Sequence, residues 1–197
     1  MKKTAVVIEN VQPLLDCGRY AIKCLAGDPV RITADIYKDG HDVIAAALKW
    51  RMRGAVRWHE VPMQHEGNDV WSGSFAVSTI GDCEYTVEAW LDAYETWREE
   101  FRRKYEGGQE DLSSEAREGA HLLEYGARCT AGKAAAQTLR QAAKSLAAAS
   151  RDAAAALAAQ KDLSGLMARV LDRAIGSEFR PHGRIMVERQ AALFAAW

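Results

Sequence analysis

A change of hydrophobic period in the middle of the chain, between Cys83 and Lys104, most constrains the fold. From Tyr85 apolar residues occupy every second position, which is typical of a half-buried strand. From Trp97 aromatic residues occupy every fourth position, which is typical of an amphipathic helix. The chain therefore combines a strand-rich part before this stretch with a helix-rich part after it.

Short alternating segments separated by turns rich in Gly and Asp precede the change of period. In the segment 30–37, for example, one face is apolar and the other polar. Trp50 lies on the apolar face of its own segment, so we expect it in the core. Residues 66–69 are expected to form a turn. Such a series of short strands predicts an immunoglobulin-like β-sandwich. The expected strands are 5–11, 20–25, 30–37, 43–53, 58–63, 71–77 and 83–92.

Helices are expected in nearly all of the chain after Tyr94. The first helix ends at Gly107-Gly108, and a second, beginning among residues 111–114, continues to about Cys129. Three residues are expected to pack this second helix against its neighbours. These residues are Leu122, Leu123 and Tyr125.

A long Ala-rich segment, residues 131–160, is expected to form the next helix. Its apolar positions follow alternating steps of four and three residues, a seam of small side chains that includes Leu139 and Leu146. Asp162 is expected to cap a further helix, which gives a bundle of three or four helices. The apolar stripe expected of this further helix comprises Leu163, Leu166, Met167, Val170, Leu171, Ala174 and Ile175.

A final alternating segment, residues 184–189, follows the helices. A strand at this place suggests that the chain returns to the sandwich and that the helices are an insertion. The predicted class is α+β, an immunoglobulin-like β-sandwich with an inserted α-helical bundle. The predicted domains are the sandwich, residues 1–94 with 183–197, and the bundle, residues 95–182.

The composition indicates a globular protein without a strong electrostatic field. The formal net charge of −1 gives no reason to expect nucleic acid as a partner. The start of the chain does not resemble a signal peptide and no apolar run is long enough to cross a membrane, so a cytoplasmic location is expected. The four cysteines match no zinc pattern, and Cys17 with Cys24 is the one disulfide worth testing. No catalytic, cofactor-binding or metal-binding motif is recognised, so none of these site types is predicted.

Trp90 is the aromatic residue with two open interpretations. It lies on the same polar face of its strand as Glu88, where an indole could stack on a sugar ring. Alternatively, Trp90 is buried beneath the helices that follow or beneath another subunit. Trp90 and Trp97, which flank the change of period, are expected to hold the two parts together.

Several segments in order resemble the maltosyltransferases that extend α-1,4-glucans from α-maltose-1-phosphate, members of the α-amylase-like superfamily. The resemblance rests on V-I-E-N-V-Q-P at 7–13, D-I-Y-K-D-G-H-D at 35–42, L-K-W-R at 48–51, E-Y-T-V-E-A-W at 84–90, T-W-R at 96–98, K-Y-E-G-G-Q at 104–109 and V-E-R-Q-A-A-L-F-A-A-W at 187–197. It covers nearly the whole chain, although the bundle matches by helicity more than by motif.

The resemblance implies a β-sandwich with a helical insertion, followed by a (β/α)8 catalytic barrel beyond this chain. The family's two catalytic carboxylates lie in that barrel, so no residue here takes a catalytic role. The expected function is a non-catalytic N-terminal region that supports the barrel and a homodimer, with α-glucan as a further partner. The candidate interface or glucan contacts are Glu88, Trp90, Trp97, Leu139 and Leu146.

Two other functions stay open at this point. The first is an α-glucan-binding module, in which Trp58 and Trp90 stack on sugar rings. The second is a helix-bundle interaction domain unrelated to sugars.

Overall fold

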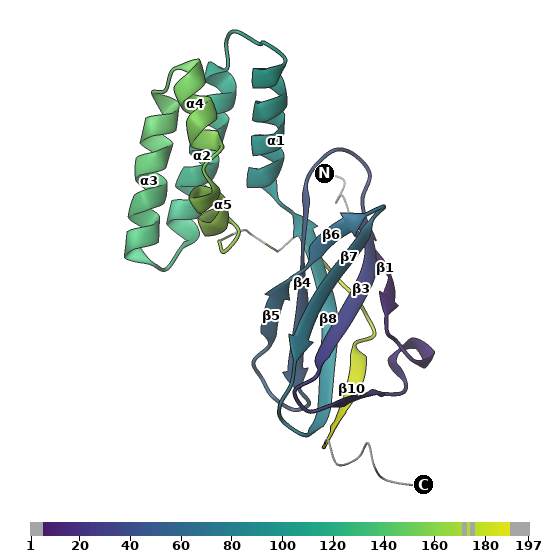
Figure 1. The fold of residues 1–197 in the computed structure, drawn as a ribbon. Coiled ribbons are helices and arrows are strands. Elements are labelled where there is room, and N and C mark those ends of the chain that lie inside the picture. Colours follow the sequence, from purple (N-terminus) through teal and green to yellow (C-terminus); the bar gives the residue numbers. More distant parts are fainter. Residues whose placement is uncertain (1–5, 171–172, 174–175, 190–197) are drawn as a thin grey trace. The chain divides into compact units, whose positions relative to one another are not determined.

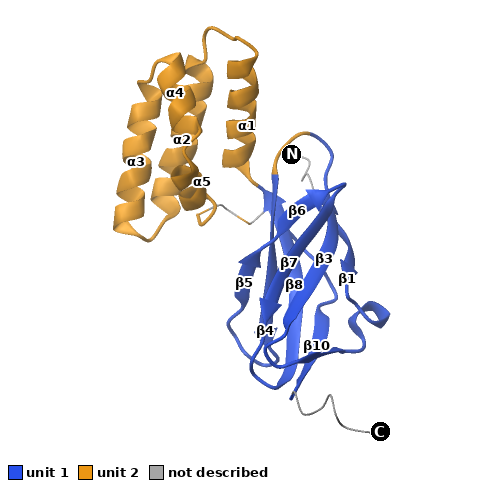
Figure 2. Cartoon of the chain, viewed as in Figure 1, with its two compact units in different colours: residues 1–40, 44–91, 174–197 blue, residues 41–43, 92–173 orange. Residues whose placement is uncertain are grey.

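The computed structural model describes residues 6–170, 173 and 176–189 and shows two compact units. One unit, blue in Figure 2, comprises residues 1–40, 44–91 and 174–197 and contains the strands. The other unit, orange in Figure 2, comprises residues 41–43 and 92–173 and contains the α-helices. The α+β class predicted from the sequence is confirmed.

The strand unit contains a four-stranded antiparallel sheet. Its strands, in spatial order, are β1 (Val7–Gln12), β3 (Pro29–Tyr37), β7 (Val70–Ala76) and β6 (Gln64–Gly67). The alternation predicted for β3 is present, because Val30, Ile32 and Ala34 are buried while Arg31 is exposed. A short 3₁₀ helix (Asp16–Gly18) follows β1.

The second sheet of this unit has six strands. Their spatial order is β2 (Ile22–Leu25), β10 (Gly183–Glu188), β8 (Gly81–Leu91), β4 (Ile44–Met52) and β5 (His59–Pro62), with β9 (Ser177–Glu178) also paired to β8. Strands β2 and β10 are parallel, and the other pairs are antiparallel. Because β10 lies between β2 and β8, this sheet uses chain segments from both sides of the helices (Figure 1).

Buried side chains of both sheets form one hydrophobic cluster. Ile32 and Ile36 of the four-stranded sheet belong to it, as do Leu48 and Val87 of the six-stranded sheet. Trp50 packs against the same cluster, and its ring stacks on Phe75 at a centroid distance of 5.1 Å. The prediction that Trp50 belongs to the core is therefore confirmed.

The helical unit contains five α-helices within the described residues. They are α1 (Ala93–Glu106), α2 (Ser113–Cys129), α3 (Lys133–Ala147), α4 (Arg151–Ala158) and α5 (Lys161–Met167). The Asp92 carboxylate begins α1 by accepting the N–H of Glu95 at 2.9 Å, and Gly107 ends it. The ends predicted for α1 and α2 are confirmed.

The single Ala-rich helix expected over residues 131–160 is wrong. Instead α3 ends at Ala147 and α4 begins at Arg151. The break shifts the buried face, so that Ala154 and Ala158 are buried while Ala153 is exposed. Residues 147–149 are all alanine, the residue that favours helix most strongly. No glycine or proline indicates the break, so the apolar seam seemed continuous in the sequence.

Two smaller expectations are also corrected. Glu66 and Gly67 belong to β6, and the turn lies at Asn68 and Asp69, which both have positive φ. Tyr125 is 41% exposed rather than packed, because small residues such as Ala120 supply the buried face of α2.

Strand β9 lies within the range expected to be helical, yet it pairs with β8. In the helix capped near Asp162, Leu163 and Met167 are buried as expected. The remaining predicted positions Leu171, Ala174 and Ile175, like residues 190–197, lie outside the described residues.

Candidate functional site

Charged side chains surround Trp58 on the outward face of the six-stranded sheet. Lys49 and Arg51 alternate with Trp50 along β4, so they point away from the core. Glu84 stands opposite Arg51 in the strand register, and Arg51 Nε donates a hydrogen bond to Glu84 Oε1 at 2.5 Å. A second ion pair joins β4 and β8, because Lys49 Nζ lies 3.3 Å from Oε2 of Glu88.

Trp58 precedes β5 and is half-buried among these charges. The guanidinium of Arg51 lies 4.3 Å from its ring centroid, and Lys49 Nζ lies 5.8 Å away. Both distances are within the range of cation–π attraction. His182 approaches the indole edge-on, with the ring centroids 5.3 Å apart. The tryptophan therefore lies within a polar surface rather than in the hydrophobic core.

The segment between β9 and β10 completes this surface. His182 lies between two carboxylates, with Nδ1 3.7 Å from Glu84 Oε2 and Nε2 3.5 Å from Glu178 Oε1. Arg180 pairs with Glu178 at 2.8 Å. Thr86 Oγ1 donates to the backbone carbonyl of Phe179 at 2.8 Å and so holds this segment against β8. We call the set the Trp58 cluster; its members are Lys49, Arg51, Trp58, Glu84, Glu88, Glu178, Arg180 and His182.

The charges of the Trp58 cluster balance one another. Partial burial acts to raise the pKa of Glu178, but the hydrogen bond and charge of Arg180, helped by His182 and Lys49, outweigh it and hold that pKa below its usual range. Each of the three carboxylates of the cluster is thus paired with one of its cations, Glu88 with Lys49, Glu84 with Arg51 and Glu178 with Arg180. Such a surface offers an aromatic ring edged with hydrogen-bonding groups.

The two tryptophans among the five predicted contact residues, Trp90 and Trp97, are buried. Trp90 is 5% exposed and Trp97 is 3% exposed. Trp97 Nε1 donates to the carbonyl of Glu115 at 2.8 Å, and its ring contacts those of Tyr94 and Phe101. Trp97 therefore packs α1 against α2. Whether either residue meets glucan or another subunit in a longer protein stays a prediction.

Leu139 and Leu146 are also in the interior, at 0% and 1% exposure. Both belong to the hydrophobic cluster of the helical unit, together with Leu123 of α2 and Leu163 of α5. The part of the predicted seam that lies on α3 is therefore packed within this unit, whereas its expected continuation at Ala153 is exposed. Of the five predicted contact residues, Glu88 belongs to the Trp58 cluster, and the other four lie in buried surroundings.

The four cysteines are all free. The Cys17–Cys24 disulfide that the sequence left for testing does not form in this structure. Burial raises the pKa of the Cys83 thiol to about 11, so Cys83 is a neutral packing residue at physiological pH. Across residues 6–170, 173 and 176–189, no three His, Cys, Asp or Glu residues gather closely enough to hold a metal ion. No helix in that part of the chain is long and apolar enough to cross a membrane.

Sequence reasoning missed the three members of the Trp58 cluster that follow the helices. Glu178, Arg180 and His182 lie in a stretch without hydrophobic period, and only the pairing of β9 and β10 with β8 brings them to Glu84. The sequence also offered Trp58 as a sugar contact, and the structure leaves Trp58 half-buried beside charged groups while Trp90 is buried.

Fold and site together define a class, an α+β chain of two compact units with a charge-balanced surface around a tryptophan. Comparison with known families identifies the chain more narrowly than this structural class does. The chain belongs to the family described as alpha-1,4-glucan:maltose-1-phosphate maltosyltransferase, domain N/S, whose profile matches residues 4–189. The family resemblance inferred from the sequence motifs is confirmed.

Curated relatives carry the same name, alpha-1,4-glucan:maltose-1-phosphate maltosyltransferase. The chain is 38% identical to the protein of Chlorobaculum tepidum over 192 residues and 37% identical to that of Myxococcus xanthus over 200 residues. Each match covers 98% of this chain but only 28% and 30% of those relatives. A relative from Burkholderia pseudomallei is 33% identical, and the chain spans 17% of its length. The chain thus spans less than a third of these relatives.

Proposed function

We propose that this chain is the non-catalytic N-terminal portion of a cytoplasmic maltosyltransferase. The whole protein would transfer maltosyl units from α-maltose-1-phosphate to α-1,4-glucan, and its catalytic barrel would lie outside this chain. One observation carries the proposal, namely that a domain N/S profile covers residues 4–189 while the chain matches less than a third of its relatives. In the Trp58 cluster the charged groups are paired with one another, as in a surface that supports the catalytic barrel and takes no part in the reaction.

We propose further that the architecture is an immunoglobulin-like sandwich interrupted by an inserted helical bundle. The domain bounds expected from the sequence were residues 1–94 with 183–197 and residues 95–182, and we propose to move them to the limits of the compact units, so that the insertion comprises residues 92–173. The position of β10 between β2 and β8 supports the insertion, because the chain returns to the same sheet after the helices. The shared hydrophobic cluster of the two sheets supports the sandwich.

An assay of phosphate release tests the proposed function. In a retaining mechanism a carboxylate of the barrel displaces phosphate from the donor, and the glucan acceptor then takes the maltosyl group. We expect the longer protein to release phosphate from α-maltose-1-phosphate when maltoheptaose is present, and this chain alone to release none. Release by the chain alone would refute the non-catalytic role. No release by the longer protein would refute its proposed activity.

The proposed protein is a homodimer. Leu139 and Leu146 are buried inside the helical unit, so the contact between copies has to use exposed side chains instead. Sedimentation equilibrium over a series of concentrations measures the mass of the chain and of the longer protein. A monomer mass for both at every concentration would exclude this part of the proposal.

A second candidate function is α-glucan binding at the Trp58 cluster. The observation in its favour is a half-buried indole surrounded by carboxylates and guanidinium groups that can bond sugar hydroxyls. Titration with maltoheptaose, followed by tryptophan fluorescence, tests it. We expect Trp58→Phe to abolish the change in emission and Trp71→Phe, which alters a half-buried indole of the other sheet, to preserve it. An unchanged emission of the wild-type chain at millimolar sugar would exclude this function.

A further inference from the structure

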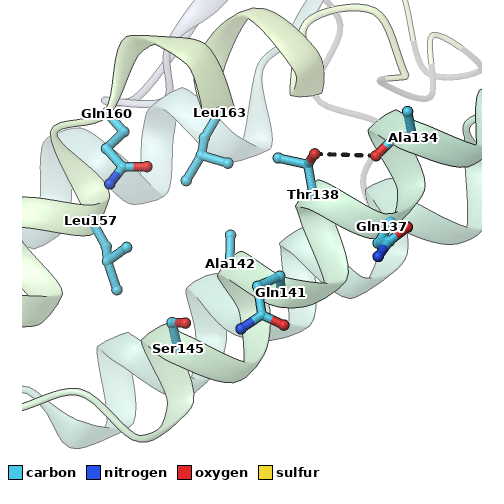
Figure 3. A pocket seen from close by; sticks show the side chains of 9 residues that line it. All are labelled: Ala134, Gln137, Thr138, Gln141, Ala142, Ser145, Leu157, Gln160 and Leu163. Atoms are coloured by element: carbon cyan, nitrogen blue, oxygen red, sulfur yellow. Dashed lines mark hydrogen bonds between the residues drawn. The ribbon is translucent and has the colours of Figure 1, made fainter.

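One groove on the helical unit differs from other grooves of this unit in the side chains that line it. It lies along α3 and is closed on its other side by residues at the end of α4 and in α5 (Figure 3). Its volume is about 690 Å³, within the range of about 300–1,000 Å³ that is typical of small-molecule sites. The groove is open to solvent along the exposed face of α3, so a ligand can reach it.

None of the nine side chains that line this groove is charged. Other grooves of the same unit contain charged residues, for example Arg128 and Arg140 between α2 and α3, and Arg98 and Glu99 between α1 and α4. A phosphate or carboxylate ligand would find no cation here to compensate for its desolvation. The groove chemistry therefore favours a neutral ligand.

The polar groups of the groove are amides and hydroxyls. Gln137, Gln141 and Gln160 contribute carboxamides, and Ser145 and Thr138 contribute hydroxyls. Thr138 Oγ1 already donates to the carbonyl of Ala134 at 3.1 Å. A carboxamide offers a donor and an acceptor at adjacent atoms, and each sugar hydroxyl likewise donates and accepts. Three exposed carboxamides on two sides of one groove can thus bond to a row of hydroxyls.

Apolar side chains form the rest of the lining. Leu163 is 3% exposed and Leu157 is half-buried, and both contribute to the groove beside Ala142. The carbon-bound hydrogens of a sugar ring can rest on such a surface. A docked helix is a less suitable occupant, because its own backbone groups are already bonded and it would remove water from five polar side chains without replacing their hydrogen bonds.

We infer that the groove formed by α3, α4 and α5 binds a segment of neutral α-1,4-glucan. The inference rests on the proposed function, from which the glucan identity comes, and adds a site remote in sequence from Trp58. It assigns Gln137, Gln141 and Gln160 as the residues that bond to the sugar hydroxyls. A glucan chain held there would be retained by the helical unit independently of any site in the catalytic part.

Side-chain amide resonances test the inference directly. The ¹⁵N-labelled chain is titrated with maltoheptaose, and the NH₂ signals of Gln137, Gln141 and Gln160 are followed. We expect all three to shift together and to saturate. Gln141→Leu, which removes one exposed carboxamide and suits a helix, should weaken binding about fivefold. The matched control Gln64→Leu, on exposed β6, should leave the affinity unchanged.

Three further outcomes would overturn the inference, and a fourth separates it from the proposed function. No shift of the three amides at millimolar maltoheptaose excludes the site. Shifts confined to the Trp58 indole N–H assign sugar to the sheet instead of the groove. An equal response to cellohexaose excludes α-glucan as the preferred ligand. Failure of the phosphate-release assay with the amide shifts intact would refute the proposed enzyme while the groove retains its sugar ligand.

Discussion

At the scale of single residues, the contact between Gly119 and Trp97 limits the volume of the helical core. A Cβ atom at position 119 would lie 2.1 Å from Cζ2 of Trp97, a buried ring held between Tyr94 and Phe101. We therefore expect Gly119→Ala to displace the ring and to lower the free energy of unfolding by about 1–3 kcal/mol. Urea unfolding followed by circular dichroism at 222 nm measures this loss.

Gly165→Ala is the matched control for Gly119→Ala. Gly165 is an exposed residue of α5, and no atom lies within 4 Å of a Cβ built there. Since alanine restricts the unfolded chain and favours helix, this variant should gain about 0.5–1 kcal/mol. Equal losses in the two variants would show that the Trp97 contact is not the cause.

The carboxyl group of Asp92 caps α1, but it is buried, and burial disfavours its charged form. Burial raises the pKa of its carboxyl, and Glu95 adds to the shift, although the hydrogen bond from the Glu95 N–H opposes it. The folded pKa therefore lies above the unfolded value of about 3.9. It follows that the contribution of Asp92 to stability is largest below the unfolded pKa and falls as the pH rises through the folded pKa.

Asp92→Asn should consequently match or exceed the stability of the wild type near neutral pH, because an amide keeps the cap without a buried charge. The advantage should shrink below about pH 4, where the wild-type carboxyl is protonated. Asp92→Ala should lose about 1 kcal/mol, since it removes the bond to the Glu95 N–H. Urea unfolding at the two pH values measures both variants, and a pH-independent deficit of Asp92→Asn would contradict the argument.

At the scale of elements, Arg98 ties three helices together. Its Nε donates to the carbonyl of Ala158 at 2.6 Å, and one guanidinium nitrogen bonds to the Glu95 carboxylate at 2.7 Å and to Ser164 Oγ at 2.6 Å. Arg98→Ala leaves these half-buried acceptors without their donor, so we expect a loss of about 1–3 kcal/mol. Arg98→Lys should recover only part of it, because an ammonium group cannot reproduce the planar fork.

Arg102, one turn further along α1, provides the control for Arg98. It pairs with Glu99 and Glu106 at 2.8 Å on the exposed surface of the same helix. Exposed pairs of this kind contribute less than about 1 kcal/mol. Thermal unfolding of Arg98→Ala and Arg102→Ala therefore should differ clearly, and similar losses would mean that the bonds of Arg98 to α4 and α5 add little.

Elements with a strong hydrophobic period could be predicted from the sequence, and those without one could not. The alternation of β3 and the aromatic spacing of α1 indicated both the element and its buried face. By contrast β6 is almost wholly polar, so only its pairing with β7 defines it as a strand. The break between α3 and α4 was missed because alanine continues through it.

The same distinction applies to the candidate site. Glu88 was predicted from its place on the polar face of β8, since alternation alone determines that position. His182 could not be predicted, because it reaches Glu84 through the pairing of strands separated by the whole helical unit. The amides of the α3 groove were missed for a related reason, since the path of α4 and α5 past α3 depends on the break after Ala147.

At the scale of the whole molecule, the strand order predicts which parts of the chain can be removed. Ala89 of β8 pairs with Ser177 of β9 in an antiparallel manner, so the chain leaves and re-enters the sheet at neighbouring points. Residues 93–175 can therefore be replaced by a Gly/Ser loop of about four residues, as in a hairpin. We expect this excised chain to retain both sheets and to unfold cooperatively, as measured by amide NMR dispersion and thermal unfolding.

Truncation after Val170 removes fewer residues than the excision of residues 93–175, but it should destabilise the strand unit far more. It deletes β10, which separates β2 from β8, and with it Ile185 and Val187, which are both 0% exposed in the core of the strand unit. The loss of two buried aliphatic side chains and two rows of strand pairing exceeds what a marginally stable domain tolerates. We therefore expect the truncated chain to lose the dispersed amide signals of the sheets. If the truncated chain retained those signals and the excised chain lost them, the strand unit would not depend on the return of the chain after the helices, and the proposed insertion would be refuted.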